Sequence, residues 1–307
     1  MYRLAAAFAR ESPLKTALQE LLALLDLEPI EVNLFRGLSP PDPASQRVFG
    51  GQVLGQALVA AGRTVESGIA HSLHAYFLRP GDPKAPILYQ VDRTRDGRRF
   101  TTRRVKAIQH GAAIFHLEAS FQRPEPGPEH QAAMPEAPDP ETLPTWSQFM
   151  EQTARAAGKS AAWDGTSVHR RPFDSRYASA FNPWVATPLP PRLLVWIRAD
   201  GDLPDLPLVH QCVLAYASDF TLIDTALLPH AVVWDDEGYQ IASLDHAMWF
   251  HRALRADEWL LLAHESPVAA GARAFSTARV FTRDGRLVAS VVQEGLVRPR
   301  APSDARR

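Results

Sequence analysis

A single carboxylate interrupts an apolar stretch in the second half of this 307-residue chain. Between Val209 and Phe220 the only formally charged residue is Asp219, and the matching stretch from Val53 to Ala61 contains no acid. A buried carboxylate without a partner is energetically costly, or its pKa rises until it is neutral. Asp219 therefore either serves a purpose that offsets this cost or lies at the solvated end of a helix.

Two further polar residues lie in strand-like segments downstream. Ser243 belongs to the segment 238–251, which we expect to be one strand with Ser243 and His246 on opposite faces. Gln293 ends an apolar series in the last expected strand. A hydroxyl and an amide among apolar neighbours could hold a water beside Asp219. Taken alone, each is better explained as a strand-end residue bonded to nearby backbone.

Other patterns typical of catalysis or metal binding are weaker. Cys212 lies in an apolar stretch that keeps a thiol protonated and inert, so we expect a core residue. The histidines of His71-Ser72-Leu73-His74 point to opposite faces of a strand and have no further ligands nearby. The spacing of His230 and Asp235 matches some acyltransferases, but it falls in a connection and arises often by chance. We expect neither a metal nor a cofactor.

The elements that must position these residues occur twice. Residues 97–105 (GRRFTTRRV) and 271–280 (GARAFSTARV) are nearly the same, and each follows a similar strand-like segment. This spacing is far longer than that of a solenoid, so it indicates two related domains. Each unit contains one buried helix and several antiparallel strands. We therefore expect an α+β double hot-dog fold, in which each of two fused units wraps a sheet around a long helix.

We expect the chain to divide into three parts. Residues 1–123 form the N-terminal hot-dog unit, 124–191 a proline-rich linker with an irregular connection, and 192–307 the C-terminal unit with the catalytic residues. The expected helices are 13–27, 52–61 and 148–157, and residues 209–228 are expected to be largely helical. The expected strands are 71–78, 87–93, 99–109, 113–123, 194–198, 238–251, 258–264, 273–282 and 287–297.

Composition restricts the location and partners of the protein. Hydrophobic residues make up 46% of the chain, and the net charge of -1 gives no general attraction to nucleic acid or an anionic membrane. No apolar run approaches the roughly 20 residues that span a bilayer. The single cysteine excludes an internal disulfide and fits a reducing compartment. We expect a cytoplasmic protein that binds no nucleic acid and does not cross a membrane.

Several ordered segments resemble the acyl-CoA thioesterase II family, the double hot-dog thioesterases of bacteria and peroxisomes. The similarity covers nearly the whole chain. It implies hydrolysis of acyl-CoA to free fatty acid and CoA, within fatty acid metabolism, and we further expect a homo-oligomer. The similar segments are 48–52 (VFGGQ), 71–82 (HSLHAYFLRPGD), 216–219 (YASD), 245–252 (DHAMWFHR) and 292–295 (VQEG).

The resemblance also implies roles for individual residues. In the family an Asp on the second helix, a Thr or Ser on the next strand and a Gln on the last strand hold the hydrolytic water. These positions correspond to Asp219, Ser243 and Gln293, and the serine keeps the hydroxyl while losing a methyl group that would restrict its rotamer. The resemblance further suggests substrate contacts at Gly50, Gly51, Gln52 and His71.

Two other functions and the number of active sites need separate tests. An enoyl-CoA hydratase would need Asp245 and His246 in one pocket, which opposite faces of a strand would prevent. A non-catalytic acyl-CoA-binding protein would lack the Asp, Ser and Gln. Since the first helix offers no acid and only Ser120 lies near the position that matches Gln293, we expect one working centre per chain.

Overall fold

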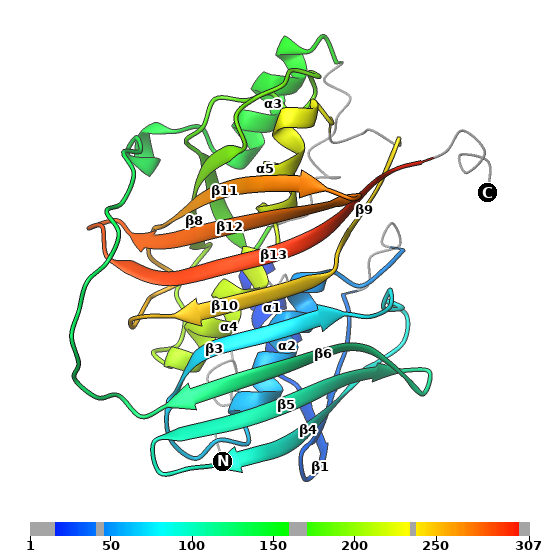
Figure 1. Cartoon of the computed structure of the whole chain (residues 1–307), viewed down its shortest axis with the longest axis vertical. Helices are drawn as coiled ribbons and strands as arrows, with labels where there is room; N and C mark the ends of the chain where they lie inside the picture. Colours follow the sequence, from blue (N-terminus) through cyan, green and yellow to red (C-terminus); the bar gives the residue numbers. More distant parts are fainter. Residues whose placement is uncertain (1–15, 41–45, 160–170, 234–237, 301–307) are drawn as a thin grey trace.

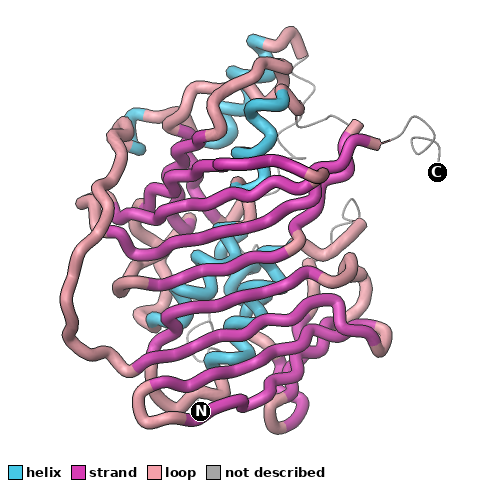
Figure 2. The backbone as a smooth tube through the Cα atoms, in the orientation of Figure 1, coloured by secondary structure: helices cyan, strands magenta, loops and turns pink. Residues whose placement is uncertain are grey.

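All strands in the described part of the chain belong to one antiparallel sheet, and the main helices cover one of its faces (Figure 1, Figure 2). The computed structural model describes residues 16–40, 46–159, 171–233 and 238–300. Within these ranges the sheet has 13 strands. This arrangement confirms the expected double hot-dog class.

The N-terminal half contributes two helices and six strands. Helix α2 (Gly50–Gly62) has almost no exposed residue, which fits its apolar composition and extends the predicted 52–61 by a short margin. Helix α1 (Ala17–Leu25) buries four leucines and begins with a capping box at Thr16. The strands are β1 (Glu28–Glu31), β2 (Leu34–Gly37), β3 (Ile69–Phe77), β4 (Ile87–Asp96), β5 (Phe100–Gln109) and β6 (Ala112–Gln122).

The C-terminal half repeats this plan with more interruptions. Its central helix is α4 (Pro207–Ser218), followed by the short helix α5 (Leu222–Leu227) and the 3-10 turn η3 (Leu228–His230). Its strands are β8 (Arg192–Ala199), β9 (Tyr239–Ser243), β10 (Asp245–Phe250), β11 (Leu260–Ala270), β12 (Arg273–Thr282) and β13 (Leu287–Pro299).

The segment between the halves runs along one side of the sheet and then adds structure to the second half (Figure 1). It contains the turn η2 (Pro140–Thr142) and helix α3 (Trp146–Ala156), close to the predicted 148–157. It also contains a strand that we did not predict, β7 (Phe173–Tyr177), which pairs with β8. Phe173 and Tyr177 face the core while the residues between them alternate, a pattern too short to stand out in the sequence.

The two halves share the sheet without a break. Along it the strands follow the order β1-β2-β4-β5-β6-β3-β10-β13-β12-β11-β8-β7, and β9 also pairs with β13. The halves meet where β3 pairs with β10, and there Leu73 lies opposite Met248 with both side chains fully buried. Behind this junction α2 packs directly on α4. Glycines allow the contact: a Cβ on Gly51 would come within 2.3 Å of the Tyr216 carbonyl oxygen.

Candidate active site

Asp219 lies at the point where the second central helix stops. It is the C-cap of α4, and α5 starts three residues later. The stretch 209–228 is largely helical as predicted, but it is interrupted between Ser218 and Leu222. The carboxylate is partly buried rather than solvated, because the turn directs it toward the sheet and the start of α2.

The structure brings the three predicted polar residues into one cluster. Gln293 Nε2 donates to Asp219 Oδ1 at 2.8 Å and lies 2.6 Å from Ser243 Oγ. Ser243 Oγ in turn donates to the same Asp219 oxygen at 3.4 Å. The three side chains come from the end of α4, from β9 and from β13, and Gln293 is only 1% exposed. Residues far apart in sequence thus surround one carboxylate oxygen.

The surroundings of Asp219 adjust its acidity toward neutrality. Burial raises the pKa of Asp219 to about 6, while hydrogen bonds from Gln293, the Gly51 N–H and Ser243 act in the opposite direction. Next to Asp219 in the sequence, Phe220 stacks on Phe49 with centroids 4.8 Å apart. A carboxylate with such a pKa is ionised at neutral pH and is basic enough to take a proton from water.

A bulge in the sheet changes which residues face the cluster. Ser243 pairs with Gly295, whereas Ala247 pairs with Val292, so the register slips by one residue near Leu244. The predicted strand 238–251 is therefore two strands. His246 now lies on the same face as Ser243, contrary to the prediction from strict alternation, because one extra residue inverts the order of faces.

His246 and Asp245 do not form an acid–base pair. The carboxylate of Asp245 accepts a hydrogen bond from the backbone N–H of Glu294 at 2.7 Å. The imidazole of His246 is fully buried and bonds through Nε2 to Ser218 Oγ at 3.0 Å. With these different partners, the two residues offer no site for hydration of an enoyl thioester.

The start of α2 forms the opposite wall of the cluster. A Cβ on Gly50 would lie 2.6 Å from Asp219 Oδ2 and 3.0 Å from the ring of Phe77, so only glycine allows this approach. Phe49, the N-cap of α2, makes no side-chain hydrogen bond to the first turn. Gln52 has another function, since its buried amide donates to the backbone oxygen of Leu38 at 3.2 Å.

His71 is not brought to this cluster. Its Nε2 lies 2.8 Å from Ser120 Oγ, and its ring contacts Phe100 edge-on. His71 also precedes Phe77 by six residues of β3, on the order of 20 Å along an extended strand. The two residues are therefore near opposite ends of the strand, and only Phe77 is close to Gly50.

The corresponding position in the N-terminal half is apolar. The repeated sequence aligns Thr101 with Ser276; Ser276 pairs with Gln293, and Thr101 pairs with Phe121. Phe121, rather than the predicted Ser120, thus matches Gln293, because a shift of one residue changes the face of the sheet. Alignment of Gln52 with Gln211 likewise places Ala60 where the second half has Asp219.

Other candidate sites offer no catalytic chemistry. Cys212 is fully buried, and burial raises the pKa of its thiol far above the usual range. Asp235 of the His230 motif lies outside the described residues. Within the residues that are described, no three His, Cys, Asp or Glu side chains are grouped to hold a metal ion.

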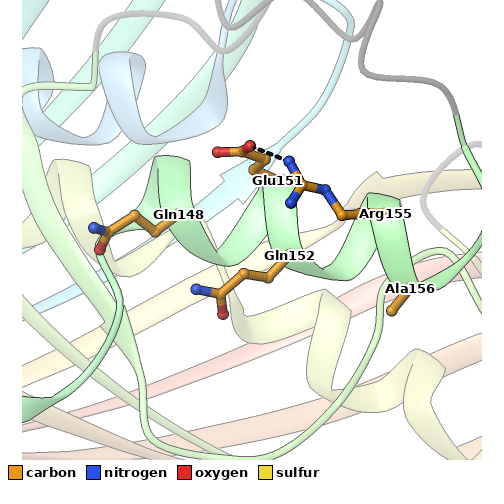
Figure 3. Close-up of a pocket in the computed structure, with 5 residues that line it drawn as sticks. All are labelled: Gln148, Glu151, Gln152, Arg155 and Ala156. Atoms are coloured by element: carbon orange, nitrogen blue, oxygen red, sulfur yellow. Dashed lines mark hydrogen bonds and ion pairs between the residues drawn. The ribbon is translucent and has the colours of Figure 1, made fainter.

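A surface groove of about 450 Å³ lies away from the cluster, on the exposed side of α3 (Figure 3). Its only charged pair is Glu151 with Arg155, 2.8 Å apart on successive helical turns. None of the three clustered polar residues lines it. The lining residues are Gln148, Glu151, Gln152, Arg155 and Ala156.

Comparison with protein families gives matches to both halves of the chain. Residues 168–296 match the family model described as acyl-CoA thioesterase, and residues 39–122 match the acyl-CoA thioesterase N-terminal domain. Acyl-CoA thioesterase 2 of Haemophilus influenzae is 42% identical, over 92% of this chain and 98% of its own. The chain belongs to the acyl-CoA thioesterase family. It is therefore a thioester hydrolase.

Other relatives extend this thioesterase comparison to animals and to solved structures. Human acyl-coenzyme A thioesterase 8 is 42% identical, over 90% of this chain and 88% of its own. The crystal structure of an acyl-CoA thioesterase II from Mycobacterium marinum aligns with a TM-score of 0.75 and 44% identity, covering 93% of this chain and 99% of that one. A hot-dog protein from Alicyclobacillus acidocaldarius, 18% identical with a TM-score of 0.72, shows the same fold.

One helical stretch of the thioesterase is apolar enough to cross a membrane by length and composition alone. It runs over Pro207–His230, and 61% of its most apolar window is buried inside the fold. This stretch contains α4, whose apolar surface packs on α2 and the sheet. Its hydropathy is accounted for by the core of the second half.

Proposed function

We propose that this thioesterase hydrolyses acyl-CoA by direct attack of a water molecule, with Asp219 as the general base. Ser243 and Gln293 fix the carboxylate and the water. A thioester has weak resonance and a good leaving group, so a water oriented beside a base suffices without a covalent intermediate. Base catalysis of this kind typically contributes about 10²–10⁴-fold.

The proposal rests on one observation: the two carboxylate oxygens of Asp219 have different neighbours. Oδ1 accepts from Gln293 and Ser243, at 2.8 Å and 3.4 Å. Oδ2 faces Gly50 at the start of α2. Gln293 and Ser243 hold the first oxygen, and the Gly51 N–H also donates to the carboxylate. We assign proton acceptance to the second oxygen, which lies close to a helix N-terminus.

The same helix start suits the thioester carbonyl. Backbone N–H groups in the first turn of a helix attract developing negative charge. The absence of a side chain at Gly50 and Gly51 lets a substrate come close to that backbone. Phe49, Phe77 and Phe220 surround the site with apolar surface, which fits an acyl chain and excludes bulk water.

An isotope experiment separates water attack from nucleophilic attack by Asp219. A single turnover in ¹⁸O-water, with enzyme in excess over acyl-CoA, should place the label in the released fatty acid and none in the enzyme. Attack by the carboxylate would form a mixed anhydride, and its hydrolysis at the protein carbonyl would leave ¹⁸O in the Asp219 peptide. Label in that peptide would contradict the proposal.

The chemical assay also separates the two alternative functions. Release of free CoA from saturated acyl-CoA requires hydrolysis, because a hydratase needs an unsaturated substrate and a binding protein releases nothing. A cytoplasmic location, a homo-oligomeric state and a role in lipid metabolism stay predictions from the sequence. Gel filtration with light scattering tests the second of these.

A further inference from the structure

In the side-chain amide of Gln293, the nitrogen has hydrogen-bond partners and the oxygen has none among the described residues. Its nitrogen lies 2.8 Å from Asp219 Oδ1 and 2.6 Å from Ser243 Oγ, so both N–H groups have acceptors. Its oxygen Oε1 is buried and meets no hydrogen-bond donor within the described chain. A buried carbonyl left unpaired is destabilising, and it leaves the orientation of the amide undetermined.

A second buried atom without a partner lies across the sheet. His246 Nδ1 has no partner among the described residues, and the side chain is fully buried. The pairing of Ala247 with Val292, continued by one residue, places His246 directly opposite Gln293 on neighbouring antiparallel strands. Side chains directly opposite in this way are within contact distance. The two unpaired atoms thus belong to adjacent side chains on one face.

The other nitrogen of His246 decides the direction of the bond. Nε2 lies 3.0 Å from Ser218 Oγ, which either donates or accepts. Burial lowers the pKa of His246 to about 3, an effect that the neighbouring Gln293 side chain opposes, so the ring is neutral and carries one N–H. A proton on Nε2 would set the Nδ1 lone pair against Oε1. A proton on Nδ1 pairs both atoms, and the single proton of the Ser218 hydroxyl, which also lies 2.9 Å from the Ala215 carbonyl oxygen, is then donated to Nε2 instead.

We propose that His246 is a positioning residue for the hydrolysis: its Nδ1–H donates to Gln293 Oε1 and holds the amide nitrogen toward Asp219 and Ser243. This inference rests on the role proposed above for Gln293. A rotated amide would set its oxygen against the Asp219 carboxylate. The hydrogen-bonded series Ser218–His246–Gln293–Asp219 begins and ends on consecutive residues at the end of α4.

Two substitutions, one without and one with an N–H donor, test the donor at His246. His246→Phe keeps a ring but has no N–H, and it should lower kcat about tenfold with KM nearly unchanged. His246→Asn places an amide nitrogen as many bonds from Cα as Nδ1, and it should recover most of the activity. Thermal denaturation of both variants reports the structural effect separately. Equal loss of kcat in the two variants would overturn the proposal.

A double-mutant cycle separates the positioning role from the role of Gln293 itself. Gln293→Ala alone should lower kcat, and adding His246→Phe should lower it no further, because His246 acts through that amide. Losses that multiply would show that His246 acts independently and overturn the positioning role alone. Full activity of Gln293→Ala would remove the proposed role of Gln293 as well.

A measurement on the unmodified enzyme does not depend on any variant folding. With ¹⁵N-labelled histidine, long-range ¹H–¹⁵N correlation distinguishes the two neutral tautomers. His246→Asn identifies the signal by its loss. We expect the proton on Nδ1 and no change in tautomer between pH 5 and 8. A proton on Nε2 would exclude donation to Gln293 and overturn the proposal.

Discussion

Burial of the Asp219 carboxylate costs stability but also makes it a stronger base. Burial raises its pKa to about 6, and hydrogen bonds from Gln293, the Gly51 N–H and Ser243 keep it from rising further. Without those donors the pKa would be higher, and a smaller fraction of the carboxyl would be ionised near neutral pH. The balance between burial and donors therefore sets the useful pH range of the enzyme.

Removing the proton-accepting ability of Asp219 should abolish most of the activity. Asp219→Asn keeps the shape and should lower kcat by at least about 10²-fold with a smaller change in KM. The comparison variant is Asp224→Asn on α5: burial also raises the pKa of Asp224 to about 6, and this carboxylate interacts with Asp219 through charge alone, with no hydrogen bond to Gln293 or Ser243 in the described structure. Steady-state release of CoA measures both variants. Equal losses in the two would contradict a specific role for Asp219.

The pH dependence follows from the same group. Since the base must be ionised, kcat/KM should rise with pH through a midpoint near 6 and level off above it. Gln293→Ala removes a hydrogen bond that lowers the pKa, so the remaining activity should show a higher midpoint. Ser120→Ala, on the other face of the sheet, should leave the profile unchanged. A profile that is flat from pH 5 to 8 would exclude Asp219 as the titrating base.

At the scale of helices and strands, sequence periodicity predicted the regular elements and missed the places where an element is interrupted. The helix at 52–61 and the strands of the repeated motif were predicted because their apolar residues recur at a constant period. The helix break after Ser218 and the bulge near Leu244 change the direction of the chain, but the pattern of apolar residues in the sequence does not mark either of them. Both irregularities belong to the site, and for that reason the role of His246 could not be found by alternation of faces.

The close approach of α2 to α4 can be tested at two adjacent glycines. A Cβ on Gly51 would meet the Tyr216 backbone at 2.3 Å, so Gly51→Ala should lower stability by about 1–3 kcal/mol. A Cβ on Gly50 would meet the Asp219 carboxylate at 2.6 Å, so Gly50→Ala should lower kcat at least about tenfold, by moving a reacting group. Gly127→Ala, with no atom within 4 Å of the new carbon, is the control.

These glycine variants are compared by thermal denaturation and by kcat. Gly51→Ala should mainly lower the melting temperature, because the Tyr216 backbone cannot easily move away. Gly50→Ala should mainly lower kcat, because the Asp219 side chain can move but then leaves its catalytic position. If Gly50→Ala proves as active as Gly127→Ala, the position of Asp219 Oδ2 is not important for the reaction.

At the scale of the whole molecule, the two duplicated halves differ: only the C-terminal half has the polar cluster in the described structure. Phe121 and Ala60 occupy the positions that match Gln293 and Asp219, so the N-terminal half has an apolar surface where the C-terminal half has its polar cluster. The repeated motif was enough to predict two units. The strand register was needed to find the residue that matches Gln293. It is Phe121, one residue after the Ser120 considered from the sequence.

We expect one acyl chain to bind per protomer. Isothermal titration of Asp219→Asn with a non-hydrolysable acyl-CoA should give a stoichiometry of about one, because the N-terminal half has no matching carboxylate, hydroxyl and amide. The same variant should show no second activity with its own pH dependence. Two equivalent binding sites would contradict the assignment of the N-terminal half as a scaffold.

The ends of the long sheet determine how copies of this protein can meet. A free edge strand presents unpaired backbone groups that invite further strands and lead to aggregation. At one edge, β1 has the sequence Glu-Pro-Ile-Glu with every residue exposed, so a proline removes one donor and two like charges repel an incoming strand. At the other edge, α3 packs against β7, and Arg176 bonds to the Leu143 backbone. Both edges of the sheet thus carry features that oppose the addition of a strand from another chain.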